Sequence, residues 1–177
     1  KSDVLNLLRN FMLKAANIGN TSKSGEDIIK ILDLAEKYVD NLSDTHLLPE
    51  HEKIIYEIIG SGMYLKAKLL LQAEHGSLFI KENNSLIRTY ASAPVLNKIF
   101  PREQGNINRV YETQNPTILS ADYITHIRPE LEQLSIGSDI TIPLTYKNKN
   151  FGVLSFFSPS HFSFNKSHLY QLQSLLK

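Results

Sequence analysis

The sequence contains no cysteine. This absence excludes disulfide bonds, thiolate catalysis, zinc–thiolate sites and the thioether attachment of a chromophore. The chain also lacks an excess of charge of either sign, because 19 lysines and arginines stand against 18 aspartates and glutamates. Without a basic field to attract phosphates, nucleic acid is a poor candidate partner.

Long hydrophobic runs are missing as well. The longest apolar stretches, such as residues 69–71 and 152–157, fall far short of the roughly 20 residues that span a bilayer. The chain starts at Lys1 in an amphipathic pattern, without the regions of a signal peptide. We therefore expect a cytoplasmic protein with no membrane segment, and the missing initial methionine suggests a fragment of a longer polypeptide.

Catalytic patterns are equally absent. The six histidines, at positions 46, 51, 75, 126, 161 and 168, have no spacing that places two imidazoles on one metal. We find no glycine-rich phosphate loop, no nucleophile elbow and no paired carboxylates. The sequence therefore predicts a domain that is not an enzyme and holds no metal.

The chain does contain the material of a folded domain, with 42% hydrophobic and 21% charged residues in a length of 177. Apolar residues recur at helical spacing over 3–16, from about 28 to 42, over 52–71 and over 165–176. Gly60 and Gly62 are expected to split or bend the third of these helices. Shorter helices are expected at 107–113 and 129–134, and the segment 94–105 is expected to be a loop.

Two segments have the pattern of β-hairpins. Residues 77–81 and 86–91 flank a polar turn at 82–85, and residues 138–146 and 151–157 flank a second turn at 147–150. A further short strand is expected at 116–119. Helices at both ends of a set of hairpins predict an α+β fold with an antiparallel sheet.

From residue 52 onward the chain resembles a GAF domain. The resemblance rests on the order of several pieces: the strand Ser-Leu-Phe-Ile at 77–80, the helix start at Gly105 followed by Val110, Thr113 and Pro116, the strand Ile-Pro-Leu at 142–144, and the strand Gly-Val-Leu at 152–154. It implies a six-stranded antiparallel sheet with helices packed on one face and a ligand pocket under irregular segments on the other. We accordingly divide the chain into an N-terminal helical extension, 1–47, and a GAF-like domain, 48–177.

The resemblance also suggests ligand-binding positions, because cyclic-nucleotide-binding GAF domains contact their ligand at the matching places. The corresponding residues here, together with one neighbour on the first strand and one histidine in the linker, are Ser77, Phe79, Tyr90, Asn106, Ile107, His126, Glu130 and Ile136. Tyr90 could stack on a purine, and amides near Gly105 could receive a phosphate. Equally, Tyr90 could be a core residue and Ser77 could fill space.

The cyclic-nucleotide signature is incomplete. Such GAF domains tend to carry an Asn-Lys pair after the last strand, then a phenylalanine, then an Asp-Glu pair on the final helix. This chain has Ser158-Pro159, Phe164 and Ser167-His168, so only the phenylalanine is kept. A bound cyclic nucleotide therefore remains a hypothesis.

The resemblance implies a regulatory sensor that binds a small molecule non-covalently. It would signal through its terminal helices to an output domain in the same polypeptide, such as a nucleotide cyclase or a kinase. The alternative is a ligand-free dimerisation or spacer domain whose pocket is filled by side chains such as Tyr90, Phe79 and Ile136. The apolar faces of the first and last helices could pack on the domain itself or on a second copy, and we expect a homodimer through these helices.

Overall fold

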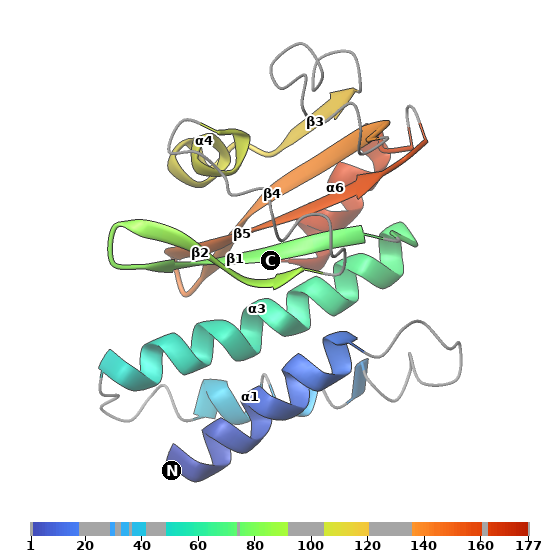
Figure 1. Cartoon of the computed structure of the whole chain (residues 1–177). Coiled ribbons are helices and arrows are strands. Elements are labelled where there is room, and N and C mark those ends of the chain that lie inside the picture. Colours follow the sequence, from blue (N-terminus) through green and yellow to red (C-terminus); the bar gives the residue numbers. More distant parts are fainter. Residues whose placement is uncertain are drawn as a thin grey trace. The chain divides into compact units, whose positions relative to one another are not determined.

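A computed structural model describes residues 2–17, 29–30, 33–35, 37–41, 49–73, 75–91, 105–120, 136–160 and 163–176. The chain divides into two compact units, Lys1–Leu69 and Leu70–Lys177. Each unit is built around its own elements, which are labelled in Figure 1.

The first unit is helical. Helix α1 spans Ser2–Asn17 and helix α3 spans Pro49–Leu71, with helical residues of a further segment at 29–30, 33–35 and 37–41. Leu5 and Met12 of α1 are each only 1% exposed and face a core. The apolar face expected from the sequence, which includes Val4, Leu7 and Phe11, is instead exposed, so the predicted buried side of this helix is wrong. From Glu57 to Ser61 every residue of α3 is buried, which shows that this helix is covered on more than one side.

The second unit is a five-stranded antiparallel sheet with two helices, α4 (Asn106–Thr113) and α6 (Lys166–Leu175). Its strands are β1 (His75–Glu82), β2 (Ser85–Ala91), β3 (Thr117–Ser120), β4 (Ser138–Tyr146) and β5 (Lys149–Ser158). They lie in the order β2-β1-β5-β4-β3 (Figure 1). Because β5 returns beside β1, residues some 75 positions apart in the chain come together at the centre of the sheet.

Both hairpins turn within two residues. Asn83, and then Lys147 with Asn148, adopt positive φ values of 55°, 47° and 61°. Such turns match the right-handed twist of the flanking strands and favour asparagine. The strands are consequently longer than the sequence patterns predicted, and the expected four-residue turns shrink to Asn83-Asn84 and Lys147-Asn148.

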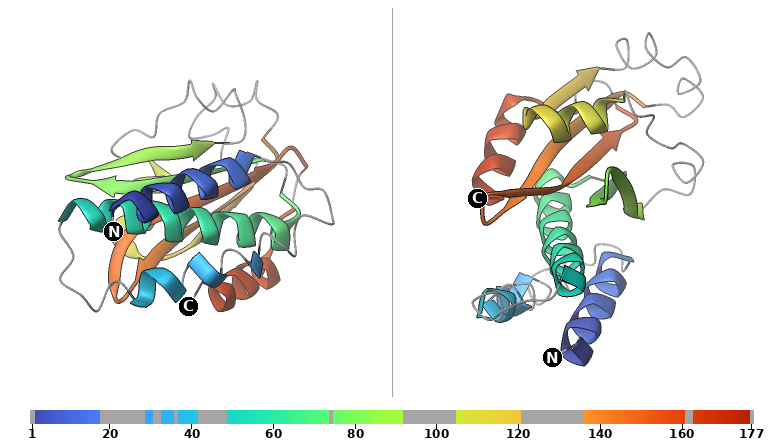
Figure 2. Two further views of the ribbon diagram at one scale, coloured as in Figure 1. Left: turned by 90° about the horizontal axis from the view of Figure 1, so that it is seen from below. Right: turned by 90° about the vertical axis from the view of Figure 1, so that its left-hand side faces the viewer.

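Two helices of the second unit lie on opposite faces of the sheet, α6 behind it and α4 in front of it in the orientation of Figure 1, as the side view in Figure 2 also shows. Helix α6 begins with a capping box: the Asn165 side chain accepts hydrogen bonds from the backbone amides of Ser167 and His168 at 2.9 and 3.2 Å. Helix α4 starts after Gly105, which offers no capping side chain.

Most predicted elements are confirmed within the described residues. The helices at 3–16, 52–71, 107–113 and 165–176, the strand at 116–119 and both hairpins occur within a few residues of the predicted bounds. The predicted split at Gly60 and Gly62 is wrong, since α3 is one continuous helix in which both glycines are buried. The loop at 94–104 and the helix at 129–134 lie outside the described residues, as does any sixth strand there.

Candidate functional site

The two faces of the sheet differ sharply in chemistry. Paired residues on neighbouring antiparallel strands point to the same face, so the register assigns each side chain to a face. One face has a buried apolar centre, which is formed by Leu78, Ile80, Ile140, Ile142, Leu144, Leu154 and Phe156, with Gly152 among them. The other, which we call the α4-side face because α4 packs on it, contains polar residues at its centre.

Those polar residues form a row across the sheet. Thr117 of β3 pairs with Thr141 of β4, Thr141 pairs with Ser155 of β5, and Ser155 pairs with Ser77 of β1. Thr141 is completely buried and Ser77 is 3% exposed. Ser155 and Thr117 are half-buried, and hydroxyl groups that are removed from water need hydrogen-bond partners.

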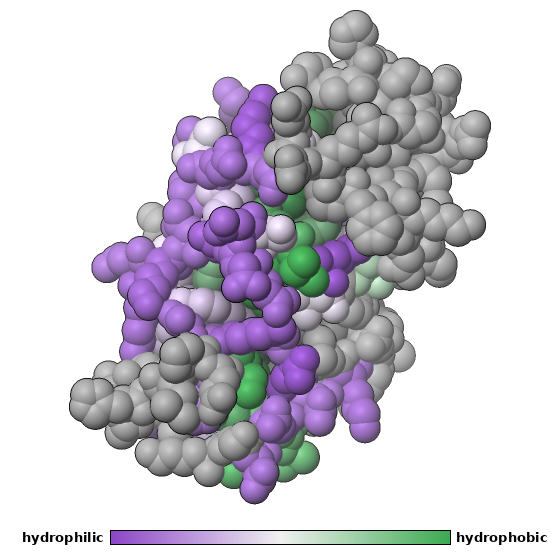
Figure 3. Space-filling model, turned by 60° about the vertical axis from the view of Figure 1, so that its left-hand side comes forward, coloured by the Kyte–Doolittle hydropathy of each residue, from purple (hydrophilic) through white to green (hydrophobic). Residues whose placement is uncertain are grey.

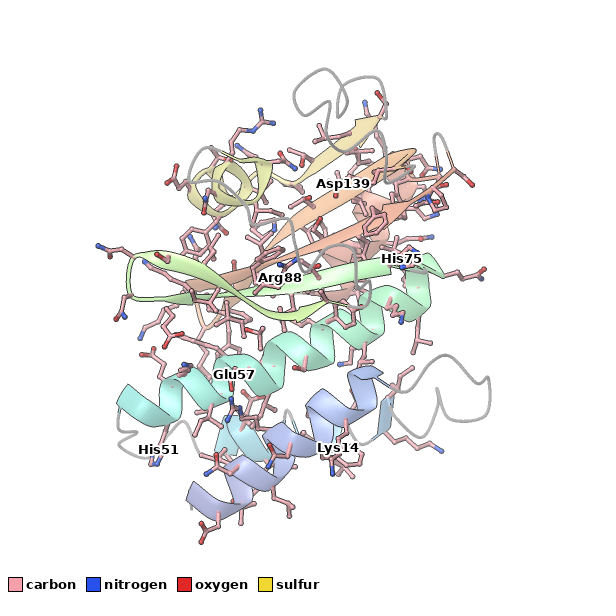
Figure 4. The ribbon with its side chains drawn as sticks, viewed as in Figure 1. Lys14, His51, Glu57, His75, Arg88 and Asp139 are labelled. Carbon is pink, nitrogen blue, oxygen red and sulfur yellow. The ribbon has the colours of Figure 1, made fainter. Side chains whose placement is uncertain are left out.

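Asp139 supplies the acceptor for two of these hydroxyls. The Thr141 hydroxyl donates to its Oδ1 at 2.7 Å and the Ser155 hydroxyl donates to its Oδ2 at 2.8 Å. Both distances lie in the normal range of O–H···O hydrogen bonds. The carboxylate therefore binds β4 and β5 together from the α4-side face, where Figure 4 shows it on β4.

Asn106, the first residue of α4, extends this arrangement to the helix. Its Nδ2 donates to Thr117 Oγ1 at 2.9 Å and to Thr141 Oγ1 at 3.3 Å. Asn106, Thr117, Asp139, Thr141 and Ser155 thus form one connected set, which we call the polar network. It joins the start of α4 to three strands, so a change at Asp139 can reach the helix through a single side chain, Thr141.

Burial raises the pKa of Asp139 from its ordinary value of 3.8 to about 6, although the hydrogen bonds from Thr141 and Ser155 act in the opposite direction. Among the described residues no lysine, arginine or histidine forms an ion pair with this carboxylate. Carboxyl groups with a perturbed pKa are concentrated at functional sites and also occur in structural hydrogen-bond networks, so Asp139 is a candidate site residue because of its pKa together with its hydroxyl partners.

Next to the polar network the α4-side face is apolar. Phe79, Val110 and Val153 form a buried cluster, against which Leu86, Ile107 and Tyr111 pack. Here α4 is anchored to the sheet by its inward-facing residues. The polar network therefore lies at the start of a helix that is held firmly along its length.

The α4-side face also carries a stacked pair of rings, His75 and Phe157, and an arginine on the edge strand β2. His75 stacks on Phe157 with ring centroids 4.8 Å apart, and the register puts Phe157 directly beside Asp139, at the same end of the sheet as His75 (Figure 4). Arg88 of β2 pairs with Phe79 in the register, and burial lowers the pKa of its guanidinium. The face thus carries an acid on β4 and a base on β2.

Several predicted ligand residues lie on or beside this face. Ser77 and Phe79 share it, as predicted; Asn106 belongs to the polar network, and Ile107 packs in the apolar cluster. Ile136 is half-buried just before β4.

Three other predictions cannot be placed in the same way. Tyr90 pairs with Leu78 in the register and its side chain lies outside the description, as do His126 and Glu130 entirely. Ligand contact by any of the eight predicted residues stays a prediction.

The polar network was missed by sequence analysis, apart from Asn106. A signal was present: in Ser-Asp-Ile-Thr-Ile, strand alternation puts Asp139 and Thr141 on one face and the buried Ile140 and Ile142 on the other. An acid and a threonine facing inward on a central strand indicate a polar site. The contribution of Ser155 follows only from the strand order, which the local pattern does not contain.

A pocket lies at the end of the sheet, apart from the polar network. It has a volume of about 560 Å³ and is lined by residues from the end of α4, the β4–β5 hairpin and the end of α6: Gln114, Pro116, Ile142, Pro143, Thr145, Lys147, Asn148, Gln173 and Leu176. It borders the part of β4 that β3, paired only with residues 138–141, leaves uncovered. None of its lining residues belongs to the polar network.

Metal and membrane features are not found in the described part of the chain. No three histidine, aspartate or glutamate side chains there gather as metal ligands. No helix within the described ranges is long and apolar enough to cross a bilayer.

Comparison with solved structures supports the fold. The chain is similar to the GAF domain of a two-component sensor histidine kinase from Bacillus halodurans, at 22% identity, a TM-score of 0.52, and coverage of 64% of this chain and 83% of that one. It is similar to the GAF domain region of a putative membrane protein from Geobacter sulfurreducens, at 23% identity, a TM-score of 0.54, and coverage of 64% and 85%. The cyanobacteriochrome TePixJ GAF domain matches at 13% identity and a TM-score of 0.53, with coverage of 67% and 82%.

No functionally curated protein matches the chain. A family model described as a GAF domain matches residues 65–177, well over half of the sequence. Together with the five-stranded antiparallel sheet and its flanking helices, this match confirms the resemblance seen in the sequence. The chain belongs to the GAF domain family.

Proposed function

We propose that this GAF domain is a regulatory sensor that binds a small molecule non-covalently on the α4-side face. The observation behind the proposal is the polar network, in which a carboxylate and two hydroxyls meet the start of α4. A network of this kind is costly as mere packing, because an apolar row would fill the same space without desolvating a carboxylate. A polar network that costs stability is expected to be kept where a ligand binds to it.

A cyclic nucleotide is the specific ligand that we test first. Asp139 can accept from the amino group of a base, and Arg88, on the same face two strands beyond β5, can pair with a phosphate. The uncapped amides at the start of α4 provide further donors. Neighbouring strands are about 4.8 Å apart and residues along a strand about 3.3 Å apart, so the backbone positions of Asp139 and Arg88 are separated by roughly 14 Å across the sheet and roughly 13 Å along it. One nucleotide can contact both residues only if the long Arg88 side chain extends toward β4.

Thermal unfolding with cAMP, with cGMP and with a metabolite library tests this proposal. A ligand at about 100 times its dissociation constant stabilises the folded state by about 2.7 kcal/mol. Wild type should gain stability with at least one compound, and Asp139→Asn should gain less. The exposed Glu112→Gln on α4 serves as the matched control for loss of one acidic charge.

The signal would pass from α4 and the terminal helices to an output domain in the same cytoplasmic polypeptide, such as a nucleotide cyclase or a histidine kinase. A coupling free energy of about 1–3 kcal/mol between ligand and output suffices for regulation. We propose no catalytic role for the chain itself. Turnover of any nucleotide by the purified chain would contradict that part of the proposal.

A second candidate is a dimerisation or spacer domain without a ligand. One observation favours it: Val4, Leu7 and Phe11, which share one side of α1, are 43%, 70% and 41% exposed. Most of the described surface visible in Figure 3 is hydrophilic, so an exposed apolar stripe is distinctive. Sedimentation velocity should show a homodimer that Leu7→Ser weakens, whereas Asn10→Ser on the same helix leaves it intact.

A further inference from the structure

The shortest hydrogen bonds around Asp139 both run toward its carboxylate, and Thr141 Oγ1 has a longer contact of 3.3 Å with Ser155 Oγ. Thr141 and Ser155 each have a single hydroxyl hydrogen, and both hydrogens are donated to Asp139. Thr141 Oγ1 in turn accepts from Asn106 Nδ2. The two hydroxyl donors next to Asp139 are therefore already engaged, and what the carboxylate has left to offer is lone pairs.

Asp139 itself has spare acceptor capacity. A carboxylate can accept about four hydrogen bonds, two on each oxygen. The structure assigns one to Oδ1, from Thr141, and one to Oδ2, from Ser155. Each oxygen thus keeps room for one further donor, and two donors side by side match the spacing of the two oxygens.

No positive charge of the described residues compensates this carboxylate. The two ion pairs within the first unit, Arg9–Glu57 and Lys66–Asp33, do not involve it. Arg88 is three strands away in the order β4-β5-β1-β2. A negative charge that is partly buried and has only neutral partners attracts a cation or a strong donor.

We propose that the ligand group bound at Asp139 is a planar pair of N–H donors on one carbon, as in an amidinium, a guanidinium or an aminated heterocycle. This inference rests on the proposed sensor function and specifies the chemistry of its site. The pair spans Oδ1 and Oδ2 and replaces the water that those oxygens lose. At Asp139 itself, anionic and acceptor-only groups are rejected, because they would face the lone pairs of the carboxylate; an anionic group elsewhere on the ligand is compatible with the site.

Three small molecules of nearly one shape separate these possibilities. Benzamidine is a cation with two parallel N–H donors, benzamide is neutral with donors on one side only, and benzoate is an anion with none. Titrations of the whole chain, followed by amide NMR signals of Asn106, Asp139 and Thr141, should give affinities in the order benzamidine, benzamide, benzoate. Because this comparison uses the unmodified protein, it does not depend on whether a variant folds.

The isosteric variant Asp139→Asn provides a second test of the same proposal. It should weaken benzamidine binding about tenfold or more, since one charge-assisted pair is lost. Glu112→Gln, which removes an exposed acid from α4, should leave the affinity unchanged. The inference would be overturned if benzoate bound as tightly as benzamidine, or if the Asp139→Asn variant bound benzamidine with the affinity of the wild type.

The proposed function and this inference fail in different ways. If a molecule from the metabolite screen binds on the α4-side face while benzamidine does not bind, the donor-pair assignment is wrong and the sensor function stands. If nothing shifts stability or any of these NMR signals, both are wrong.

Discussion

Thr141 donates its hydroxyl hydrogen to Asp139 at 2.7 Å while its oxygen accepts from Asn106 at 3.3 Å. One buried side chain thereby joins a carboxylate on β4 to the first residue of α4. Thr141 is 0% exposed, so water cannot replace either bond without opening the sheet. Through this link, Asp139 is connected to the start of α4 by one side chain.

Replacing Asp139 by asparagine should raise the stability of the protein at neutral pH. Burial raises the pKa of this carboxyl to about 6 from 3.8, which means that the fold disfavours the charged form. Asparagine keeps the volume and one acceptor, and the Ser155 hydroxyl can rotate to accept from the new amide. We expect a gain of about 1–3 kcal/mol near pH 7.5, measured by urea unfolding.

The pH dependence gives this prediction its control. Because the pKa is higher in the folded state, that state holds the proton more tightly, and the contribution of Asp139 to stability is full below about pH 4 and is lost as the pH rises to about 6. The advantage of Asp139→Asn over wild type should therefore shrink between about pH 7.5 and about pH 5. A constant difference across this range would contradict the raised pKa.

Removing the amide of Asn106 should loosen the start of α4. Asn106→Ala loses two hydrogen bonds to Thr117 and Thr141, and alanine otherwise favours the helix. We expect a loss of about 1–2 kcal/mol in unfolding free energy and faster amide hydrogen exchange in α4. Glu112→Ala makes an exposed alanine in the same helix and should show neither effect.

The first unit allows a test of its own. Arg9 of α1 pairs with Glu57 of α3, which is only 5% exposed. Arg9→Met leaves a buried carboxylate without its partner, and we expect a loss of about 2–4 kcal/mol, because Arg9 is 37% exposed and water can partly replace it. The double variant with Glu57→Met should recover most of that loss. Additive losses in this double-mutant cycle would show that the pair is not coupled.

Sequence analysis was sufficient for the elements and the family because their signals are local. The alternation in 138–146 and the turn-forming residues at 147–150 specify one hairpin without reference to the rest of the chain. Ser77 and Phe79 could be assigned to one face for the same reason, since a strand has a period of two residues.

The candidate site depended on contacts that a local pattern does not contain. Ser155 meets Asp139 only because β5 pairs with β4, and Asn106 meets Thr141 only because α4 crosses that face. Raised pKa values likewise arise from the surrounding tertiary structure, not from neighbours in sequence. The exception is the pair Asp139 and Thr141, whose shared face could have been predicted from strand alternation.

Gly152 carries a prediction about the register that brings the site together. A Cβ atom added there would lie 2.4 Å from the backbone oxygen of Phe79, on the neighbouring strand β1. Because that contact is with backbone, no side-chain rotation can relieve it, and β1 and β5 must separate. Replacing glycine by alanine in a strand normally raises the unfolding free energy by about 0.5–1 kcal/mol. A decrease in the unfolding free energy at this position would therefore indicate the steric clash.

We expect Gly152→Ala to lower the unfolding free energy by about 2–3 kcal/mol, an overpacking effect, with a matching fall in melting temperature. Lys149→Ala, an exposed position on the same strand, should change it by less than about 0.5 kcal/mol. Separation of β1 from β5 also moves Phe79 away from Val110 and Val153, so α4 should loosen with the sheet. A stable Gly152→Ala variant with unchanged α4 amide signals would mean that the two strands are not in the close contact described here.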